Sequence, residues 1–134
     1  MKKIVLLLLF PFIIKAQTPP VDTGDKKNNQ LSLHDQAKLD AKKRIEGYRE
    51  QVAKGASMEL MAKTYSQDPG SAKNGGRYDG IVKGQMVEEF EKVLFDLKPG
   101  EISQVFETQY GFHFIQLIND NGNSRDCRHL LVTF

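Results

Sequence analysis

The chain has 134 residues, of which 40% are hydrophobic, and its formal net charge is +2. This length suits one domain and excludes a large multidomain enzyme, while the weak positive charge argues against a nucleic-acid-binding protein. A single cysteine excludes an internal disulfide, and no Cys/His spacing typical of structural zinc is present, so we expect no structural metal site.

The first 16 residues have the pattern of a secretory signal peptide. Two lysines follow Met1, an apolar run spans residues 4–14, and Ala16 offers a small residue for cleavage. The run is shorter than the roughly 20 residues of a membrane span, so we expect no stable membrane anchor. Removal of residues 1–16 leaves 16 basic against 17 acidic residues. We therefore expect an exported, nearly neutral protein, either periplasmic or secreted.

A long helix is predicted after a polar leader. Residues 17–31 contain prolines, a glycine and few apolar side chains, and we expect them to form a flexible leader to a single domain at residues 32–134. Ser32 followed by Asp35 resembles a capping box, which begins a helix. Apolar residues then recur every three or four positions as far as Gly55. These residues are Ala37, Ala41, Ile45, Tyr48 and Val52.

Two shorter helices are predicted further along the chain. The first covers residues 58–65 and is closed by a turn at residues 68–70; the second covers residues 87–97 and is closed by Pro99 and Gly100. Between them, a stretch with four glycines predicts a loop with a short edge strand at residues 80–82. The apolar positions of the two helices are Met58, Met61, Tyr65, Val87, Phe90, Leu94 and Leu97.

The last third of the chain is predicted to form strands. Candidates lie at residues 102–107, 111–118 and 128–134, which are rich in Phe, Ile, Leu and Val. Helices followed by consecutive strands predict an α+β domain with an antiparallel sheet.

The last two strands are predicted to form a hairpin across residues 119–126, which are rich in Asn, Asp and Gly. A five-residue loop between residues 118 and 124 would place His113 directly opposite His129, on one face of the sheet. A slip of one residue would separate the two histidines. Ile115, Leu117, Cys127 and Leu131 would share their face, and Phe112, Phe114, Leu130 and Val132 would lie on the other.

The histidine pair allows three interpretations from the residues alone. The two side chains can be a coincidental pair of half-exposed strand residues. They can bind a metal together with Cys127, although no fourth ligand and no recognised spacing is indicated. They can form a Cys–His dyad, although no helix N-terminus or tight elbow precedes Cys127 to lower the pKa of its thiol.

Four sequence blocks between Gly55 and Leu117 give a further clue. They read YSQDPGSAKNGG at residues 65–76, GQMVEEF at 84–90, LKPGEIS at 97–103 and YGFHFI at 110–115. In this order and at this spacing they resemble the signature of parvulin-type peptidyl-prolyl isomerases. The resemblance implies a parvulin/FKBP-like four-stranded antiparallel sheet wrapped by about three to four helices, and no cofactor.

The chain departs from this family at its start. Parvulin domains begin with a strand carrying an Arg-His-Ile-Leu-like motif, whereas here the similar segment RHLLV stands at residues 128–132. Either the chain is a circular permutant whose last strand takes the place of the family's first, or it derives from a tandem array and retains the opening strand of the next domain. We favour the permutant.

The resemblance also implies a set of site residues. Asp68, His113 and His129 would be catalytic, with Asp68 near the substrate carbonyl. Met86 and Phe90 would form the proline pocket, with Tyr78 at a position that usually holds Leu and Tyr110 contributing a hydroxyl. Residues 77–81 replace a family Asp-Leu-Gly segment, which could change the rim of the pocket. Without the resemblance, Phe90 would be a core residue and Asp68 a turn residue.

The function that follows is cis–trans isomerisation of X–Pro bonds in unfolded or partly folded exported polypeptides. Rotation about a peptide bond has a barrier of about 18–20 kcal/mol, and catalysis requires only that the site favour the twisted amide over the planar one. Alternatives are a non-catalytic holdase module that binds Pro-containing segments, or an unstable fragment. In some parvulins a basic loop after the first strand selects phosphorylated substrates. This chain lacks that connection, so we do not expect it to require phosphorylated substrates. We expect a monomer, with a strand-exchanged dimer as the alternative.

Overall fold

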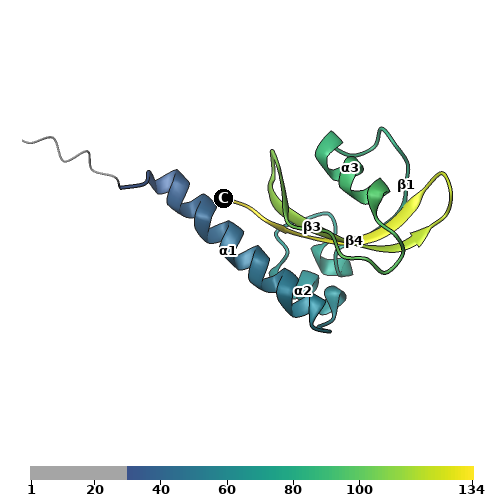
Figure 1. Ribbon diagram of the computed structural model, residues 1–134, viewed down its shortest axis with the longest axis horizontal. Coiled ribbons are helices and arrows are strands. Elements are labelled where there is room, and N and C mark those ends of the chain that lie inside the picture. Colours follow the sequence, from purple (N-terminus) through teal and green to yellow (C-terminus); the bar gives the residue numbers. More distant parts are fainter. Residues whose placement is uncertain (1–29) are drawn as a thin grey trace, which may run out of the picture. The chain divides into compact units, whose positions relative to one another are not determined.

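The computed structural model describes residues 30–134. The predicted signal peptide, residues 1–16, and residues 17–29 of the predicted leader lie outside the described residues. Residues Leu31–Phe134 form one compact unit, in which three α-helices and a short 3-10 helix accompany a four-stranded antiparallel sheet (Figure 1). This confirms the predicted α+β class. Within this described unit, we find no helix with the length and apolar character that a membrane span requires.

The two N-terminal helices each begin after a capping serine, and the sequence predicted the first of these, Ser32. Helix α1 (Leu33–Ala53) begins after Ser32, whose Oγ accepts a hydrogen bond from the backbone N–H of Asp35 at 3.1 Å. Helix α2 (Met58–Tyr65) begins after Ser57, whose Oγ accepts from the N–H of Leu60. Each side-chain oxygen satisfies a backbone donor that a helix leaves without a partner in its first turn.

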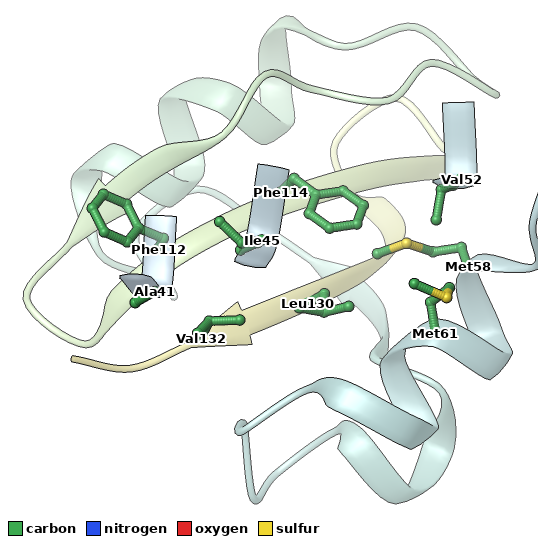
Figure 2. Close-up of a cluster of buried hydrophobic side chains, with 9 residues drawn as sticks. All are labelled: Ala41, Ile45, Val52, Met58, Met61, Phe112, Phe114, Leu130 and Val132. Atoms are coloured by element: carbon green, nitrogen blue, oxygen red, sulfur yellow. The ribbon is translucent and has the colours of Figure 1, made fainter. Parts of the chain in front are cut away.

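Helices α1 and α2 pack on one face of the sheet and bury their apolar stripes there (Figure 2). Their methyl and thioether groups meet the aromatic and branched side chains of the two longest strands. Removing such side chains from water is worth about 1.5–3 kcal/mol each, and this contact holds α1 against the sheet. The cluster consists of Ala41, Ile45, Val52, Met58, Met61, Phe112, Phe114, Leu130 and Val132.

The sheet has the order β1-β4-β3-β2, so the C-terminal strand lies inside it. Strand β4 (Arg125–Val132) pairs with β1 (Arg77–Ile81) on one side and with β3 (Gly111–Asp120) on the other. Strand β2 (Phe106–Thr108) is shorter than the predicted strand at residues 102–107, whose first residue makes only an isolated bridge.

The segment before β1 also differs from the prediction. The predicted loop contains the 3-10 helix η1 (Ala72–Asn74), and β1 begins earlier than the predicted edge strand at residues 80–82.

The predicted register of the β3–β4 hairpin is wrong by two residues. His113 pairs with Leu131 and Ile115 pairs with His129, so the two histidines are diagonal neighbours instead of directly opposed. The two strands pair further toward the turn than predicted, as far as Asp120 and Arg125, whose side chains form an ion pair at 2.6 Å. A bulge interrupts the pairing after Leu117. Because the shift is even, the two histidines still share a face, as predicted.

Helix α3 (Glu88–Asp96) covers the face of the sheet that carries the histidines. Its buried residues Phe90 and Leu94 pack on side chains of β3 and β4, and the predicted division of these strands into two faces is confirmed. The buried residues of this second cluster are Ile81, Phe90, Leu94, Ile115, Leu117 and Cys127.

Candidate functional site

A pocket of about 380 Å³ opens beside α3, on the face of the sheet that carries the histidines. All seven residues that the sequence singled out contribute to its lining, from three strands, one helix and three loops. Sequence analysis missed four others. Leu131 follows His129 by two positions in β4, and Gln85 and Val87 flank Met86, so strand alternation and adjacency could have identified them. The lining is Asp68, Pro69, Tyr78, Gln85, Met86, Val87, Phe90, Tyr110, His113, His129 and Leu131.

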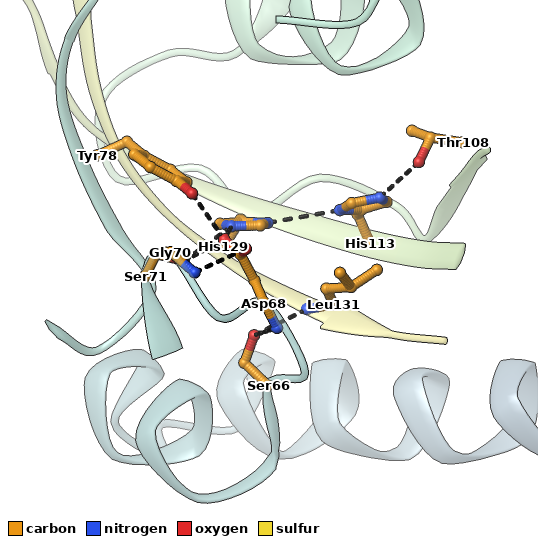
Figure 3. A network of polar contacts seen from close by, with 9 residues as sticks. All are labelled: Ser66, Asp68, Gly70, Ser71, Tyr78, Thr108, His113, His129 and Leu131. Carbon is orange, nitrogen blue, oxygen red and sulfur yellow. Dashed lines mark hydrogen bonds and ion pairs between the residues drawn. The ribbon is translucent and has the colours of Figure 1, made fainter. Parts of the chain in front are cut away.

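Asp68 reaches the histidines because the chain after α2 runs along the end of β4. The backbone N–H of Gln67 donates to the carbonyl oxygen of Leu131 at 2.8 Å. The N–H of Leu131 donates to Ser66 Oγ at 3.2 Å (Figure 3). These two hydrogen bonds place the turn at residues 68–70 directly beside His129.

Three side chains donate hydrogen bonds to a single oxygen of the Asp68 carboxylate. Oδ2 accepts from Ser71 Oγ at 2.6 Å, from His129 Nε2 at 2.7 Å and from the Tyr78 hydroxyl at 2.8 Å (Figure 3). The other oxygen accepts from the backbone N–H of Gly70 at 3.1 Å, so the turn role that Asp68 suggested in the sequence is present as well. These donors, His129 first, hold the pKa of Asp68 well below its ordinary value of 3.8 and keep it ionised.

The ionised carboxylate is the end of a longer hydrogen-bond chain, and it can only accept. His129 Nε2 therefore carries a proton. The chain continues from His129 Nδ1 to His113 Nδ1 across 3.4 Å, and from His113 Nε2 to the hydroxyl of Thr108 at 2.7 Å (Figure 3). Burial first, and His129 second, lower the pKa of His113 to about 4, so its ring is neutral at pH 7.

The wall of the pocket opposite the carboxylate is apolar. Phe90 is 1% exposed and meets the rings of His113 and His129 edge-on, at 5.9 and 5.3 Å between ring centroids. Phe90 is thus both a core residue and part of the lining. Met86 lies on the loop before α3, where Glu91 Oε1 accepts from the backbone N–H groups of Gly84 and Met86.

The two tyrosines of the lining differ in their surroundings. Tyr110 is 57% exposed, whereas Tyr78 is half-buried and its hydroxyl is bonded to Asp68. Burial, and then the bond to Asp68, raise the pKa of Tyr78 to about 12, so its hydroxyl stays protonated and donates.

The interpretations that used Cys127 find no support in this geometry. Among residues 30–134, no group of three or more His, Cys, Asp or Glu side chains is placed to hold a metal ion. Cys127 is buried outside the pocket lining, and burial raises the pKa of its thiol to about 12, which leaves it protonated and unreactive.

Comparison with known protein families identifies this arrangement. The rotamase family, described as the PPIC-type PPIASE domain, matches residues 26–119 of the chain. The chain belongs to this family. The matched range ends before β4, although β4 supplies His129 to the pocket of this rotamase domain.

Curated relatives of this rotamase domain are folding factors. Chaperone SurA of Alcanivorax borkumensis is 45% identical over 74 residues, which cover 54% of this chain and 17% of that protein. Foldase protein PrsA of Geobacillus kaustophilus is 48% identical over 64 residues, covering 48% and 23%. Foldase protein PrsA of Staphylococcus aureus (strain Newman) is 37% identical over 103 residues, covering 76% and 31%. The matched segments thus span less than one third of each of these relatives.

Proposed function

We propose that the chain is a peptidyl-prolyl cis–trans isomerase acting on X–Pro bonds in unfolded or partly folded exported polypeptides. The observation that carries this proposal is an apolar pocket with one ionised carboxylate, that of Asp68, among its lining residues. Exchange at X–Pro takes tens to hundreds of seconds without a catalyst, which is slow enough to limit folding.

The proposed mechanism is non-covalent. Met86 and Phe90 hold the proline ring, and Asp68 lies near the oxygen of the amide that rotates. That oxygen is electron-rich in the planar amide and less so in the twisted one, because twisting interrupts the conjugation. A fixed negative charge nearby therefore disfavours the planar form relative to the twisted form. Each 1.4 kcal/mol of this preference raises the rate about tenfold.

The histidines support this role from beneath. His113 and His129 are 4% and 3% exposed; His129 contacts the carboxylate from within the sheet, and His113 acts through His129. We assign them to orienting Asp68 through the chain of hydrogen bonds that ends at Thr108.

The cellular setting is part of the proposal. The signal-peptide pattern of residues 1–16 and the folding-factor names of the relatives support export to the periplasm or the medium. The proposed clients are exported chains with exposed X–Pro bonds, and the proposed oligomeric state is a monomer.

A proline-isomerisation assay on a short peptide tests the proposal. We expect Asp68→Ala to lower kcat/KM at least about tenfold, because the variant removes the only acidic group of the lining. The matched control is Asp79→Ala, which removes an exposed carboxylate paired with Arg77 on the same strand and is expected to keep the wild-type rate. If the wild type and both variants bind the peptide but leave its exchange at the uncatalysed rate, the isomerase proposal is refuted and the non-catalytic holdase is supported.

A further inference from the structure

Tyr78 makes two contacts that a residue used only for substrate binding would not need. Its hydroxyl donates to Asp68 Oδ2 at 2.8 Å, and its ring lies against that of His129, at 5.3 Å between centroids and tilted by 30°. Its hydroxyl is therefore already engaged within the protein (Figure 3).

Gly70 leaves room for this hydroxyl. A Cβ at position 70 would lie 2.8 Å from Tyr78 Oη and 3.6 Å from Asp68 Oδ1. Gly70 is not among the glycines with positive φ, so its backbone conformation does not require glycine. A side chain at position 70 would instead displace the hydroxyl oxygen of Tyr78.

Tyr78 also differs from the other two side-chain donors to Asp68. Ser71 is 1% exposed and does not line the pocket, and His129 approaches from the sheet below. Tyr78 approaches from the edge strand β1. Without its hydroxyl, Oδ2 would keep Ser71 and His129 as donors, and the carboxylate would lose its side-chain hydrogen bond from the edge strand.

We propose that Tyr78 is a positioning residue of the site: its hydroxyl, seated over the bare backbone of Gly70, holds the carboxylate of Asp68 in place at the pocket. This inference rests on the proposed isomerase function. It changes the role of Tyr78 from a binding side chain to one that acts through Asp68.

The kinetic test compares Tyr78→Phe, Gly70→Ala and the double variant. We expect each single variant to lower kcat about tenfold, in line with the loss of one hydrogen bond to a charged group, while KM stays within about twofold because the ring and the apolar wall remain. The double variant should be no slower than Tyr78→Phe, since without the tyrosine oxygen the new methyl group meets Asp68 Oδ1 at 3.6 Å and the ring edge at 3.9 Å, both ordinary contacts. Tyr65→Phe removes an exposed hydroxyl outside the pocket and should leave both constants unchanged.

A second measurement does not depend on activity. The free energies of unfolding of Tyr78→Phe, Asp68→Ala and their double variant should be non-additive, because the two side chains share one hydrogen bond. A wild-type kcat in Tyr78→Phe, or losses of kcat that multiply in the Gly70 double variant, would overturn the proposal. An inactive wild-type protein would refute the isomerase function instead. Additive changes in the free energy of unfolding would then show that the Tyr78–Asp68 hydrogen bond is not stabilising, and would refute the positioning role as well.

Discussion

The charge state of single buried residues determines what this site can do. His113 is 4% exposed, and its pKa of about 4 lies below the ordinary value of 6.5 because burial disfavours the charged ring. A neutral ring has one donor and one acceptor, which suits its place between Thr108 and His129. The orientation of the Asp68 carboxylate thus depends on a ring that must stay uncharged.

We therefore expect stability to fall as the pH is lowered from about 6.5 to about 4. In this window the unfolded chain binds a proton at His113 that the folded chain does not bind. The loss approaches about 3 kcal/mol, since one pKa unit corresponds to about 1.4 kcal/mol. Below about pH 3.8, Asp68 adds a further loss, because its lowered pKa contributes stability only above the ordinary value.

Urea unfolding at a series of pH values measures this dependence. His113→Gln should flatten the slope between pH 6.5 and 4, whatever its effect on absolute stability. His34→Gln, which changes an exposed imidazole on α1, is the control for the removal of a histidine as such. An unchanged slope in His113→Gln would show that another group is responsible.

At the scale of elements, close approach of backbones positions the site. Gly76 has φ of +73°, and a Cβ there would overlap the carbonyl oxygen of His129. The carbonyl oxygen of Gly76 in turn accepts from the N–H of His129 at 2.9 Å. The segment that leads into β1 therefore lies directly on the backbone of β4, beside the catalytic candidate His129.

Gly76→Ala should lower the free energy of unfolding by more than about 2 kcal/mol, because it adds both an unfavourable φ and an overlap with backbone. Gly47→Ala is a matched control in the middle of α1, where nothing lies within 4 Å of the new Cβ. It should stabilise the protein by about 0.5–1 kcal/mol through helix propensity. Chemical denaturation of both variants measures these changes in the free energy of unfolding. A stabilised Gly76→Ala variant or a destabilised Gly47→Ala variant would contradict the prediction.

The loop that carries Met86 is held by the helix that follows it. Glu91 of α3 accepts from two backbone N–H groups of this loop, those of Gly84 and Met86. Because Met86 lines the pocket, the position of this part of the lining depends on a carboxylate outside the lining.

Glu91→Gln should raise KM for an X–Pro peptide roughly tenfold, since it replaces a charged acceptor of two hydrogen bonds by a neutral one. Glu89→Gln removes an exposed charge from the same helix turn and should leave KM within about twofold. Steady-state kinetics of the two variants separate loop positioning from a general effect of charge at the start of α3. Equal KM values would exclude the positioning role.

At the scale of the whole molecule, the C-terminal strand completes the domain. Strand β4 is bonded on both sides and supplies Leu130 and Val132 to one core cluster and Cys127 to the other. Its end lies beside the beginning of α1, where the ring centroids of His34 and Phe134 are 5.8 Å apart (Figure 1). A strand that leads spatially into the first long helix fits the proposed permutation.

A reordered chain tests this arrangement. In this chain residues 123–134 come first and are joined by a short glycine-rich linker to residues 31–122, so that the cut lies in the surface turn between β3 and β4. The melting temperature should stay within several degrees of the wild-type value, because a cut in a surface turn and a short linker leave the packed elements unchanged. A chain ending at residue 119, where the family match ends, should be unfolded by circular dichroism. An unfolded reordered chain, or a folded truncated one, would contradict the role assigned to β4.

The sequence was most informative where structure depends on neighbours along the chain. The cap at Ser32 and the apolar periodicities predicted the three helices. The alternation in β3 and β4 predicted which residues share a face, including His113 and His129. The register of the hairpin was predicted wrongly, because the strands pair as far as Asp120 and Arg125 and a bulge follows Leu117, and the alternation of apolar and polar residues marks neither feature.

The composition of the site was predicted by family resemblance, and its connections were decided by the tertiary structure. Asp68, Tyr78 and His129 lie far apart in the chain, and only the pairing of β4 with β1 and with the segment after α2 brings them together. A hydrogen bond depends on distance and direction between atoms, which periodicity and composition do not encode. The sequence alone therefore determined the helices, the faces and the fold class, whereas the packed sheet determined which groups hold Asp68.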